Sequence, residues 1–244
     1  MKKTIPGIIF ARAKGRGGVN VAHNKHTAEM PVERMPVPNT VVLPMQQHIG
    51  APCTPTVKVG DTVSVGQVIG DSDKFVSAPI HATISGVVKA VGDVKLANGI
   101  ITKGVTIESD GEMRLYEGVK PPVVTNREEL LKAVRASGLV GLGGAGFPTH
   151  VKLNYPADKN VDTLVVNAAE CEPYITSDHR MMLAHPELIA DGIEYLRKYM
   201  SDYLKDAVYK ICIEKNKPDA IALLKKTFSG KDYVQVHELN AIYP

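Results

Sequence analysis

Residues 161–174 read VDTLVVNAAECEPY, a nearly continuous apolar run followed by polar residues. Such a run is typical of a buried strand in a parallel sheet, and we expect the strand over residues 161–168. It delivers Asn167, Glu170 and Glu172 to its carboxyl end, which is where open α/β sheets bind ligands. A solvated acidic loop would explain the two glutamates but not the whole arrangement.

The residues on either side of this strand alternate between helical and extended patterns. Thr125-x-x-Glu128 has the form of a helix capping box, and Pro186 and Pro218 suit the first position of two further helices. Short apolar runs at 207–213 and 233–239 predict two more strands. Alternation of this kind predicts an α/β domain with a largely parallel sheet.

A glycine-rich segment precedes the strand, and residues 141–152 read GLGGAGFPTHVK. Glycine has no Cβ, so the backbone can approach a ligand closely and turn its N–H groups toward it. Phe147 can pack against a planar ring, and Lys152 brings a positive charge suited to a phosphate. The loop follows a helix rather than a strand, so it does not satisfy the ordinary dinucleotide fingerprint, and a simple turn between helices is the alternative interpretation.

Residues 37–112 have a different character, because short runs rich in Val, Ile and Thr alternate with Gly and Asp turns. This pattern predicts a small all-β unit. The strands are expected at 39–44, 55–59, 62–69, 74–78, 82–91 and 105–109. The order of strands and turns resembles the barrel-sandwich hybrid of biotinyl and lipoyl domains. Such domains can carry a modified lysine on a hairpin tip, and Lys74 beside Phe75 is the candidate, with an ordinary surface lysine as the alternative.

The bulk composition, with 44% hydrophobic and 23% charged residues, is that of an ordinary globular protein. The net charge is +3 and the basic residues are dispersed, so nothing favours nucleic acid as a partner. No run of about eighteen apolar residues occurs, and Pro6 and Arg12 interrupt the basic N-terminus. We therefore expect a cytoplasmic chain with no transmembrane segment, for which any membrane association would be peripheral and through partner subunits.

Residues 1–36 show little periodicity and are expected to form an ordered arm, in which His23 and His26 are polar loop residues rather than metal ligands. The three cysteines, Cys53, Cys171 and Cys212, are far apart and odd in number, so a disulfide framework is not expected. No Cys-x-x-Cys occurs, so the chain alone does not supply the four cysteines of an iron–sulfur cluster, and we assign no metal ligands.

The two polar segments together have a specific form. Gly-x-Gly-Gly-Ala-Gly-Phe-Pro-Thr-x-x-Lys at 141–152, followed by Asn-Ala-x-Glu-x-Glu-Pro at 167–173, resembles the NADH-binding flavoprotein subunit of respiratory complex I. The run VVNAAECEPY, the following DHR at 178–180, and the stretches at 25–31 and 75–81 are more similar to the RnfC family of Rnf-type electron transport complexes. This resemblance covers nearly the whole chain.

The resemblance implies an arm at 1–36, a barrel-sandwich hybrid domain at 37–112 and a Rossmann-like α/β flavin- and NADH-binding domain at 121–244. The implied cofactors are FMN and NAD(H). The flavin would lie against the glycine loop, formed by Gly141, Gly143, Gly144, Ala145 and Gly146. In the family, a lysine equivalent to Lys152 lies near the flavin phosphate.

The family also assigns roles to the second segment. Asn167 and Glu170 would lie along the flavin, with the backbone of Cys171 beside it, whereas Phe147 and Glu172 would face the nicotinamide nucleotide. No residue is assigned as a catalytic acid or base, because hydride transfer does not require one. Relative to the complex I pattern, leucine replaces an arginine at 142 and alanine replaces an aspartate at 169.

The implied function is electron transfer in a membrane-bound, ion-translocating ferredoxin:NAD oxidoreductase complex, with the other subunits and NADH as partners. In the family, further segments follow the position of Pro244, including two 4Fe-4S clusters, so we expect this chain to be the N-terminal part of such a subunit. A flavin-dependent cobalamin reductase of the same family is the nearest alternative. A lipoyl-like carrier or binding module is the alternative from a different class.

Overall fold

The computed structural model describes residues 19, 21–156, 158–159, 161–204 and 206–243. Two compact units are distinguished by their internal contacts. Arg34–Ala157 form one, which we call the barrel unit. Met1–Glu33 together with Asp158–Pro244 form the other, which we call the sheet unit.

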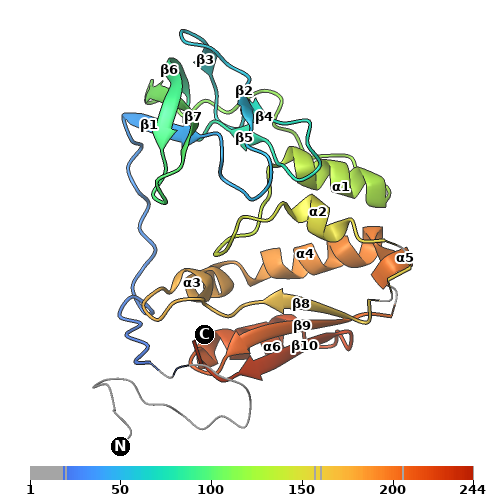
Figure 1. Ribbon diagram of the computed structural model, residues 1–244. Helices are drawn as coiled ribbons and strands as arrows, with labels where there is room; N and C mark the ends of the chain where they lie inside the picture. Colours follow the sequence, from blue (N-terminus) through green and yellow to red (C-terminus); the bar gives the residue numbers. More distant parts are fainter. Residues whose placement is uncertain (1–18, 20, 157, 160, 205, 244) are drawn as a thin grey trace, which may run out of the picture. The chain divides into compact units, whose positions relative to one another are not determined.

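Short antiparallel strands in two sheets build most of the barrel unit (Figure 1). The first sheet has the order β1-β7-β6-β3, made of Thr40–Pro44, Ile101–Ser109, Gly86–Lys95 and Thr62–Val63. The second has the order β2-β4-β5, made of Thr54–Pro55, Val68–Asp71 and Ile80–His81. The prediction of a small all-β unit is therefore confirmed.

The core of the barrel unit lies among the inward-facing residues of these strands. Val88 on β6 and Val105 and Ile107 on β7 are 0% exposed, as are Ile69 on β4 and Met45 just after β1. Alternate residues of a strand point to opposite faces, which is why the runs rich in Val and Ile bury one side only. The expected strand at 74–78 is wrong, because this segment is a bend in which the Ser77 hydroxyl donates to the Lys74 carbonyl at 2.5 Å.

Two helices, α1 (Arg127–Ala136) and α2 (Thr149–Leu153), belong to the barrel unit. Arg135 near the end of α1 pairs with Asp71 of β4 at 2.8 Å. Gly138 packs so tightly that a Cβ there would lie 2.6 Å from the Pro79 carbonyl oxygen. The contacts therefore divide the chain near residue 157. The change of periodicity had suggested a boundary near residue 121. The two differ because periodicity does not report which unit a helix packs against.

The cap of α1 lies one residue later than the sequence pattern suggested. Asn126, not Thr125, is the N-cap, and its side-chain oxygen accepts from the Glu129 N–H at 3.0 Å. The Glu129 carboxylate in turn accepts from the backbone N–H of Thr125 at 2.8 Å. The expected partner Glu128 is therefore replaced by its neighbour in the reciprocal cap.

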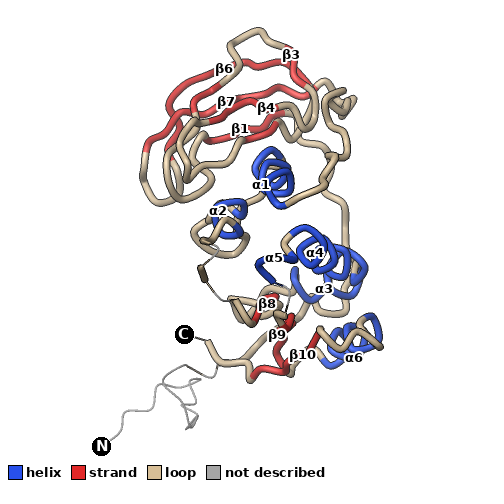
Figure 2. Tube along the Cα trace, turned by 90° about the vertical axis from the view of Figure 1, so that its right-hand side faces the viewer, coloured by secondary structure: helices blue, strands red, loops and turns tan. Residues whose placement is uncertain are grey.

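A parallel sheet of order β10-β9-β8 forms the centre of the sheet unit, with strands Val234–Leu239, Val208–Glu214 and Thr163–Asn167. Its helices are α3 (Ser177–Ala184), α4 (Pro186–Tyr199), α5 (Ser201–Leu204) and α6 (Pro218–Thr227). Helices α3 and α4 contact α6, as Figure 2 also shows, so both crossovers place their helices on one face of the sheet. The expected strands and the helices beginning at the two prolines are confirmed, whereas α3 and α5 were not anticipated. Helix α2 follows the glycine loop, as in the alternative interpretation of a turn between helices.

Strand β8 is less buried than its apolar sequence suggested. Val165 is 58% exposed and Asn167 is exposed, whereas Tyr209, Ile211 and Ile213 of the central strand β9 are 0% exposed. The expectation of a fully buried strand is wrong, because β8 is one of the two edge strands of the sheet and the helices cover one face. A continuous apolar run does not distinguish an edge strand from a central one.

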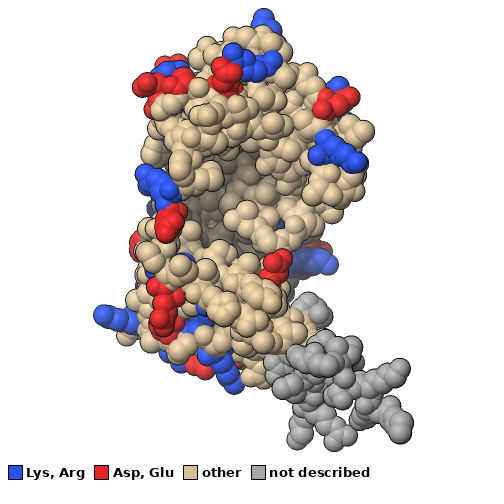
Figure 3. All heavy atoms as spheres, turned by 90° about the vertical axis from the view of Figure 1, so that its left-hand side faces the viewer, with Lys and Arg blue, Asp and Glu red and all other residues tan. Residues whose placement is uncertain are grey.

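Acidic and basic side chains alternate on the molecular surface shown in Figure 3, with no extended patch of one sign. This agrees with the small net charge of +3. Among the described residues, no helix combines the length and the apolar character needed to cross a membrane.

Candidate functional site

The glycine loop is held at its two ends by backbone hydrogen bonds. The Gly141 N–H donates to the Phe147 carbonyl at 2.8 Å, and the Thr149 N–H donates to the Leu139 carbonyl at 3.0 Å. Between these ends the chain is exposed from Leu142 to Ala145. Among the described residues, no protein acceptor is seen for the N–H groups of 142–147. The N–H groups of the exposed residues 142–145 can therefore bond a ligand.

The far side of the loop rests on residues 47–49, in the segment that follows β1. Gly146 has φ +65°, and a Cβ at this position would lie 2.9 Å from the Gln47 carbonyl oxygen and 3.0 Å from the His48 Cα. The Ala145 carbonyl accepts from the Ile49 N–H at 3.1 Å. Glycine at 146 is thus required by packing and by the left-handed backbone, whereas a Cβ at Gly144 would meet nothing within 4 Å.

The aromatic and basic residues expected beside this loop are accessible. Phe147 is 37% exposed, and Lys152 is an exposed residue of α2. The structure therefore gathers the seven site residues predicted between Gly141 and Lys152 in one part of the barrel unit. Lys74, the carrier candidate, is exposed in the bend before β5 and lies 3.7 Å from Asp73.

The second predicted segment lies at the carboxyl end of β8, in the sheet unit. Asn167 is exposed, and its side-chain oxygen accepts from the Ala169 N–H at 3.2 Å, which starts the turn after the strand. Cys171 and Glu172 are exposed, whereas the side chain of Glu170 is 0% exposed. The two predicted segments thus belong to different compact units, and the shared flavin site that the resemblance implies for them stays a prediction.

Glu170 is enclosed by partners from distant parts of the sequence. Its Oε2 lies 2.8 Å from the Lys25 Nζ and 3.4 Å from the Lys217 Nζ. The backbone N–H of His179, near the start of α3, donates to Oε1 at 3.3 Å. Burial alone would raise the pKa of Glu170, but the hydrogen bonds from Lys25 and His179 and the charge of Lys217 hold it below its ordinary value.

Lys25 connects the N-terminal arm to the turn after β8. Besides its ion pair with Glu170, the ammonium group donates to the carbonyl oxygens of Glu172 at 2.9 Å and Ile175 at 2.6 Å. Two residues later, the hydroxyls of Thr27 and Thr176 are 2.6 Å apart. The arm therefore holds both ends of the turn that exposes Cys171 and Glu172.

A second buried pair lies at the carboxyl end of β9. Lys217 is 2% exposed and its Nζ lies 2.6 Å from the Oε2 of Glu214, which also accepts from the Glu170 N–H at 3.2 Å. Sequence reasoning did not identify Lys25, Glu214 or Lys217. The sequence could have indicated Glu214 and Lys217, because charged residues gather there at the end of the predicted strand 207–213. In the sheet this strand, β9, pairs with β8.

Asp178 and His179 sit beside this network at the start of α3. Burial, followed by repulsion from Glu170, raises the pKa of Asp178 above its ordinary value. His179 Nε2 lies 2.8 Å from Asp219 at the start of α6. These contacts join the amino ends of two helices to the carboxyl ends of β8 and β9. Open α/β sheets bind ligands at the carboxyl ends of their strands.

Lys25→Met is expected to loosen the turn at 170–176 and to weaken the sheet unit by about 1–3 kcal/mol, because charged hydrogen bonds are lost. The lowered pKa of Glu170 contributes stability that is present above the ordinary carboxyl pKa and is lost as the pH falls through its folded value. Without Lys25 this acid-dependent loss should be smaller. Hydrogen exchange of 170–176 between pH 3 and 7 measures both effects. An exchange rate in Lys25→Met equal to that of the unsubstituted chain would show that Lys25 does not hold this turn.

Comparison with known proteins identifies two domains. The family model described as RnfC Barrel sandwich hybrid domain matches residues 13–112, and the family model described as Nuo51 FMN-binding domain matches residues 134–244. The barrel-sandwich hybrid expected from the strand pattern is therefore present. The second match, which includes the accessible glycine loop, defines the class: a protein with a domain of the Nuo51 FMN-binding family.

Relatives that match most of this chain define the family. It is 43% identical over 94% of its length to the C subunit of the Na(+)-translocating ferredoxin:NAD(+) oxidoreductase complex of Acetobacterium woodii, covering 52% of that protein. It is 40% identical over 94% of its length to the C subunit of the ion-translocating oxidoreductase complex of Rhodobacter capsulatus, covering 44% of that protein. The chain belongs to the RnfC family of Rnf-type complexes. It spans about half the length of the curated relatives it matches.

Proposed function

We propose that this protein is an electron-transfer subunit of a membrane-associated, ion-translocating ferredoxin:NAD oxidoreductase complex, and that it binds FMN and NADH. The relatives are named as C subunits of ferredoxin:NAD(+) oxidoreductase complexes that translocate Na(+) or protons, and the complex and the reaction are proposed from these names. The observation that carries the proposal is the glycine loop, because its backbone is exposed at 142–145 and four of the six residues from Gly141 to Gly146 have no Cβ, within a matched FMN-binding domain. The other subunits of the complex are the proposed partners, and they would supply the membrane association.

The residues present fit an FMN site in the barrel unit. N–H groups of the exposed residues 142–145 are available as donors, a Cβ at Gly144 would point into open space, and the Lys152 side chain is accessible in α2, which follows the loop. Fixed N–H groups and a lysine are suited to the phosphate of a mononucleotide. Phe147 offers a ring face to a second planar group.

We propose that the parallel sheet is part of a Rossmann-like flavin- and NADH-binding domain, with Asn167, Cys171 and Glu172 as contact residues. Their exposure at the carboxyl end of β8 supports this role. Glu170 is proposed to act indirectly, because its carboxylate is enclosed by Lys25 and Lys217 and orders the turn that carries the others.

When bound, FMN supplies the ability to take two electrons from a nicotinamide and to release them one at a time. The chain contributes binding, orientation and exclusion of water, and no general base is needed for hydride transfer. The 4Fe-4S clusters that would receive the electrons are proposed for segments of the complete subunit outside this chain.

Two alternatives make different predictions. A flavin-dependent cobalamin reductase would share the FMN site and differ in its electron acceptor, so reduction assays with ferredoxin and cob(II)alamin distinguish the two. A carrier module would use Lys74, whose exposure is compatible with modification. Mass spectrometry of protein from native cells would then find a lipoyl or biotinyl group on that lysine.

The FMN site is tested by two lysine variants of the barrel unit. Lys152→Ala is expected to weaken FMN binding about tenfold or more, because a charge-assisted contact contributes about 1.5–3 kcal/mol. Lys74→Ala is the matched control and should leave the affinity unchanged. Quenching of FMN fluorescence at equilibrium measures both, and equal affinity for Lys152→Ala and the unsubstituted chain would remove Lys152 from the site.

A further inference from the structure

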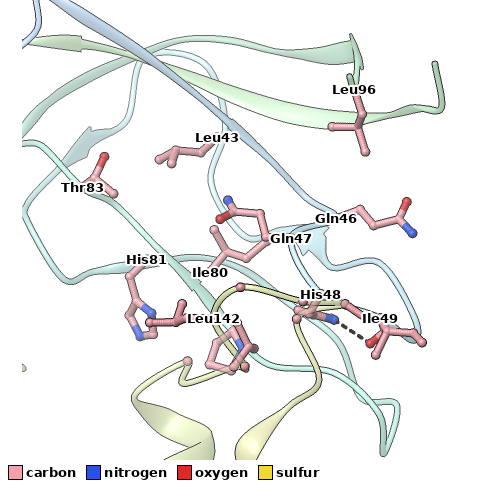
Figure 4. A pocket seen from close by; sticks show the side chains of 18 of the residues that line it. Leu43, Gln46, Gln47, His48, Ile49, Ile80, His81, Thr83, Leu96 and Leu142 are labelled. Carbon is pink, nitrogen blue, oxygen red and sulfur yellow. Dashed lines mark hydrogen bonds between the residues drawn. The ribbon is translucent and has the colours of Figure 1, made fainter. Parts of the chain in front are cut away.

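A groove of about 540 Å³ lies in the sheet unit, between the N-terminal arm and helix α3. Arm residues 27 and 30–33 line one side, and residues between Thr176 and His185 line the other. Figure 1 shows this part of the arm, in blue, beside α3. The groove beside the glycine loop, shown in Figure 4, lies in the barrel unit and shares no lining residue with the one described here.

Two contacts join the sides of this groove, which we call the arm groove. The hydroxyls of Thr27 and Thr176 are 2.6 Å apart, and the Nη1 of Arg180 donates to the Ala28 carbonyl at 3.3 Å. The ammonium group of Lys25 adds hydrogen bonds from the arm to the turn just before α3. The arm groove is therefore formed in the absence of a partner, so that binding need not order the arm.

Arg180 brings a cation without a counter-ion to the arm groove. Its side chain is half-buried, its Nε–H is buried without a partner, and its Nη2 makes no hydrogen bond to the described residues. No carboxylate among the described residues pairs with this guanidinium, although the exposed Glu33 also lines the groove. A buried donor left unpaired is unfavourable, and a carboxylate is a strong acceptor for a guanidinium. Arg180 therefore favours an acidic partner.

Large apolar side chains surround this cation. Met30 and Val32 on the arm are 53% and 70% exposed, and Met181 on α3 is 53% exposed. Apolar side chains exposed together mark interaction sites, and methionine adapts its shape to the surface that it meets. Both Arg and Met are enriched in protein–protein interfaces. An inorganic anion would leave these apolar side chains in water, whereas a peptide with an acidic residue next to apolar ones would use both features of the groove.

We propose that the arm groove binds a segment of another subunit of the complex, in which an Asp or Glu lies next to apolar side chains. The carboxylate pairs with Arg180, and the apolar side chains pack between Met181 and the arm residues Met30 and Val32. This inference rests on the proposed function only in assuming a complex of several subunits, which the names of the relatives describe. It does not depend on where FMN or NADH binds.

Site-specific cross-linking in the purified, assembled complex tests the place of this docking site. The photoreactive residue p-benzoylphenylalanine replaces Met181 or, as the matched control, Lys226, which is exposed on α6 outside the groove lining. After irradiation, position 181 is expected to cross-link to a segment of another subunit that contains Asp or Glu beside apolar residues, whereas position 226 should not reach that segment. Cross-links from position 181 only to lipid or only within its own chain would overturn the proposal, as would their complete absence.

A charge reversal tests the role of Arg180. Arg180→Glu is expected to lower the affinity of the subunit for the rest of the complex about tenfold or more, because two carboxylates would then meet in a half-buried site. Lys226→Glu makes the same change of charge outside the groove and should assemble normally. Replacing the cross-linked acidic residue of the other subunit by lysine should restore the assembly of Arg180→Glu, which would not happen if this variant were misfolded.

The outcomes separate the docking site from the proposed function. Equal assembly of Arg180→Glu and Lys226→Glu, or a loss in Arg180→Glu that the lysine does not restore, overturns the docking site while membership of the complex stands. If the unsubstituted chain does not copurify with other subunits at all, the proposed function fails as well.

Discussion

Lys217→Met is expected to destabilise the sheet unit by about 3–5 kcal/mol, because removing one member of a buried ion pair leaves uncompensated charge. Lys217 is 2% exposed and lies 2.6 Å from Glu214 and 3.4 Å from Glu170. The substitution leaves both carboxylates with one fewer cation at the carboxyl end of the sheet. Hydrogen exchange of β8 and β9 is the suitable measurement, because it reports on this unit separately from the barrel unit.

The matched control is Lys215→Met, two residues earlier. Lys215 is exposed and its ammonium reaches the Asn240 side chain at 3.2 Å, so its replacement should change little. The double variant Lys217→Met with Glu214→Leu also removes one of the two carboxylates left without this cation. It should therefore recover part of the lost stability. Equal protection in Lys217→Met and Lys215→Met would show that the buried pair does not hold the two strand ends.

Gly146→Ala is expected to cost the barrel unit about 2–4 kcal/mol, combining the strain of a left-handed backbone with overpacking. The added Cβ would meet the Gln47 carbonyl oxygen at 2.9 Å and the His48 Cα at 3.0 Å, and both are backbone atoms that cannot swing aside. The glycine loop should therefore detach from residues 47–49, the segment after β1 on which it rests. Exchange of residues 47–50 and 139–148 should rise together.

Gly144→Ala provides the control on the same loop. A Cβ at Gly144 meets nothing within 4 Å and its φ is not in the left-handed region, so the fold should be unaffected. Binding of FMN should nevertheless weaken if a ligand approaches this backbone. A stability loss in Gly144→Ala equal to that in Gly146→Ala would show that general loop stiffness, rather than contact with the barrel, explains the effect.

Local patterns in the sequence determined most of the secondary structure. Helices begin at Pro186 and Pro218 because proline suits the first helical turn, and the three strands of the sheet unit follow the predicted apolar runs. The alternating runs at 37–112 similarly produced the all-β unit. These features depend on residues within a few positions of each other, so a single sequence contains the information.

Contacts between distant residues decided the rest. Lys25 meets Glu170 across 145 positions, and Arg135 of α1 pairs with Asp71 across 64, which is why α1 packs with the barrel unit. The exposed Val165 likewise follows from the place of β8 at the edge of its sheet. The sequence by itself determined which residues could serve a flavin site. Only the tertiary structure separated the accessible Asn167, Cys171 and Glu172 from Glu170, because burial and ion pairing depend on neighbours that local periodicity does not specify.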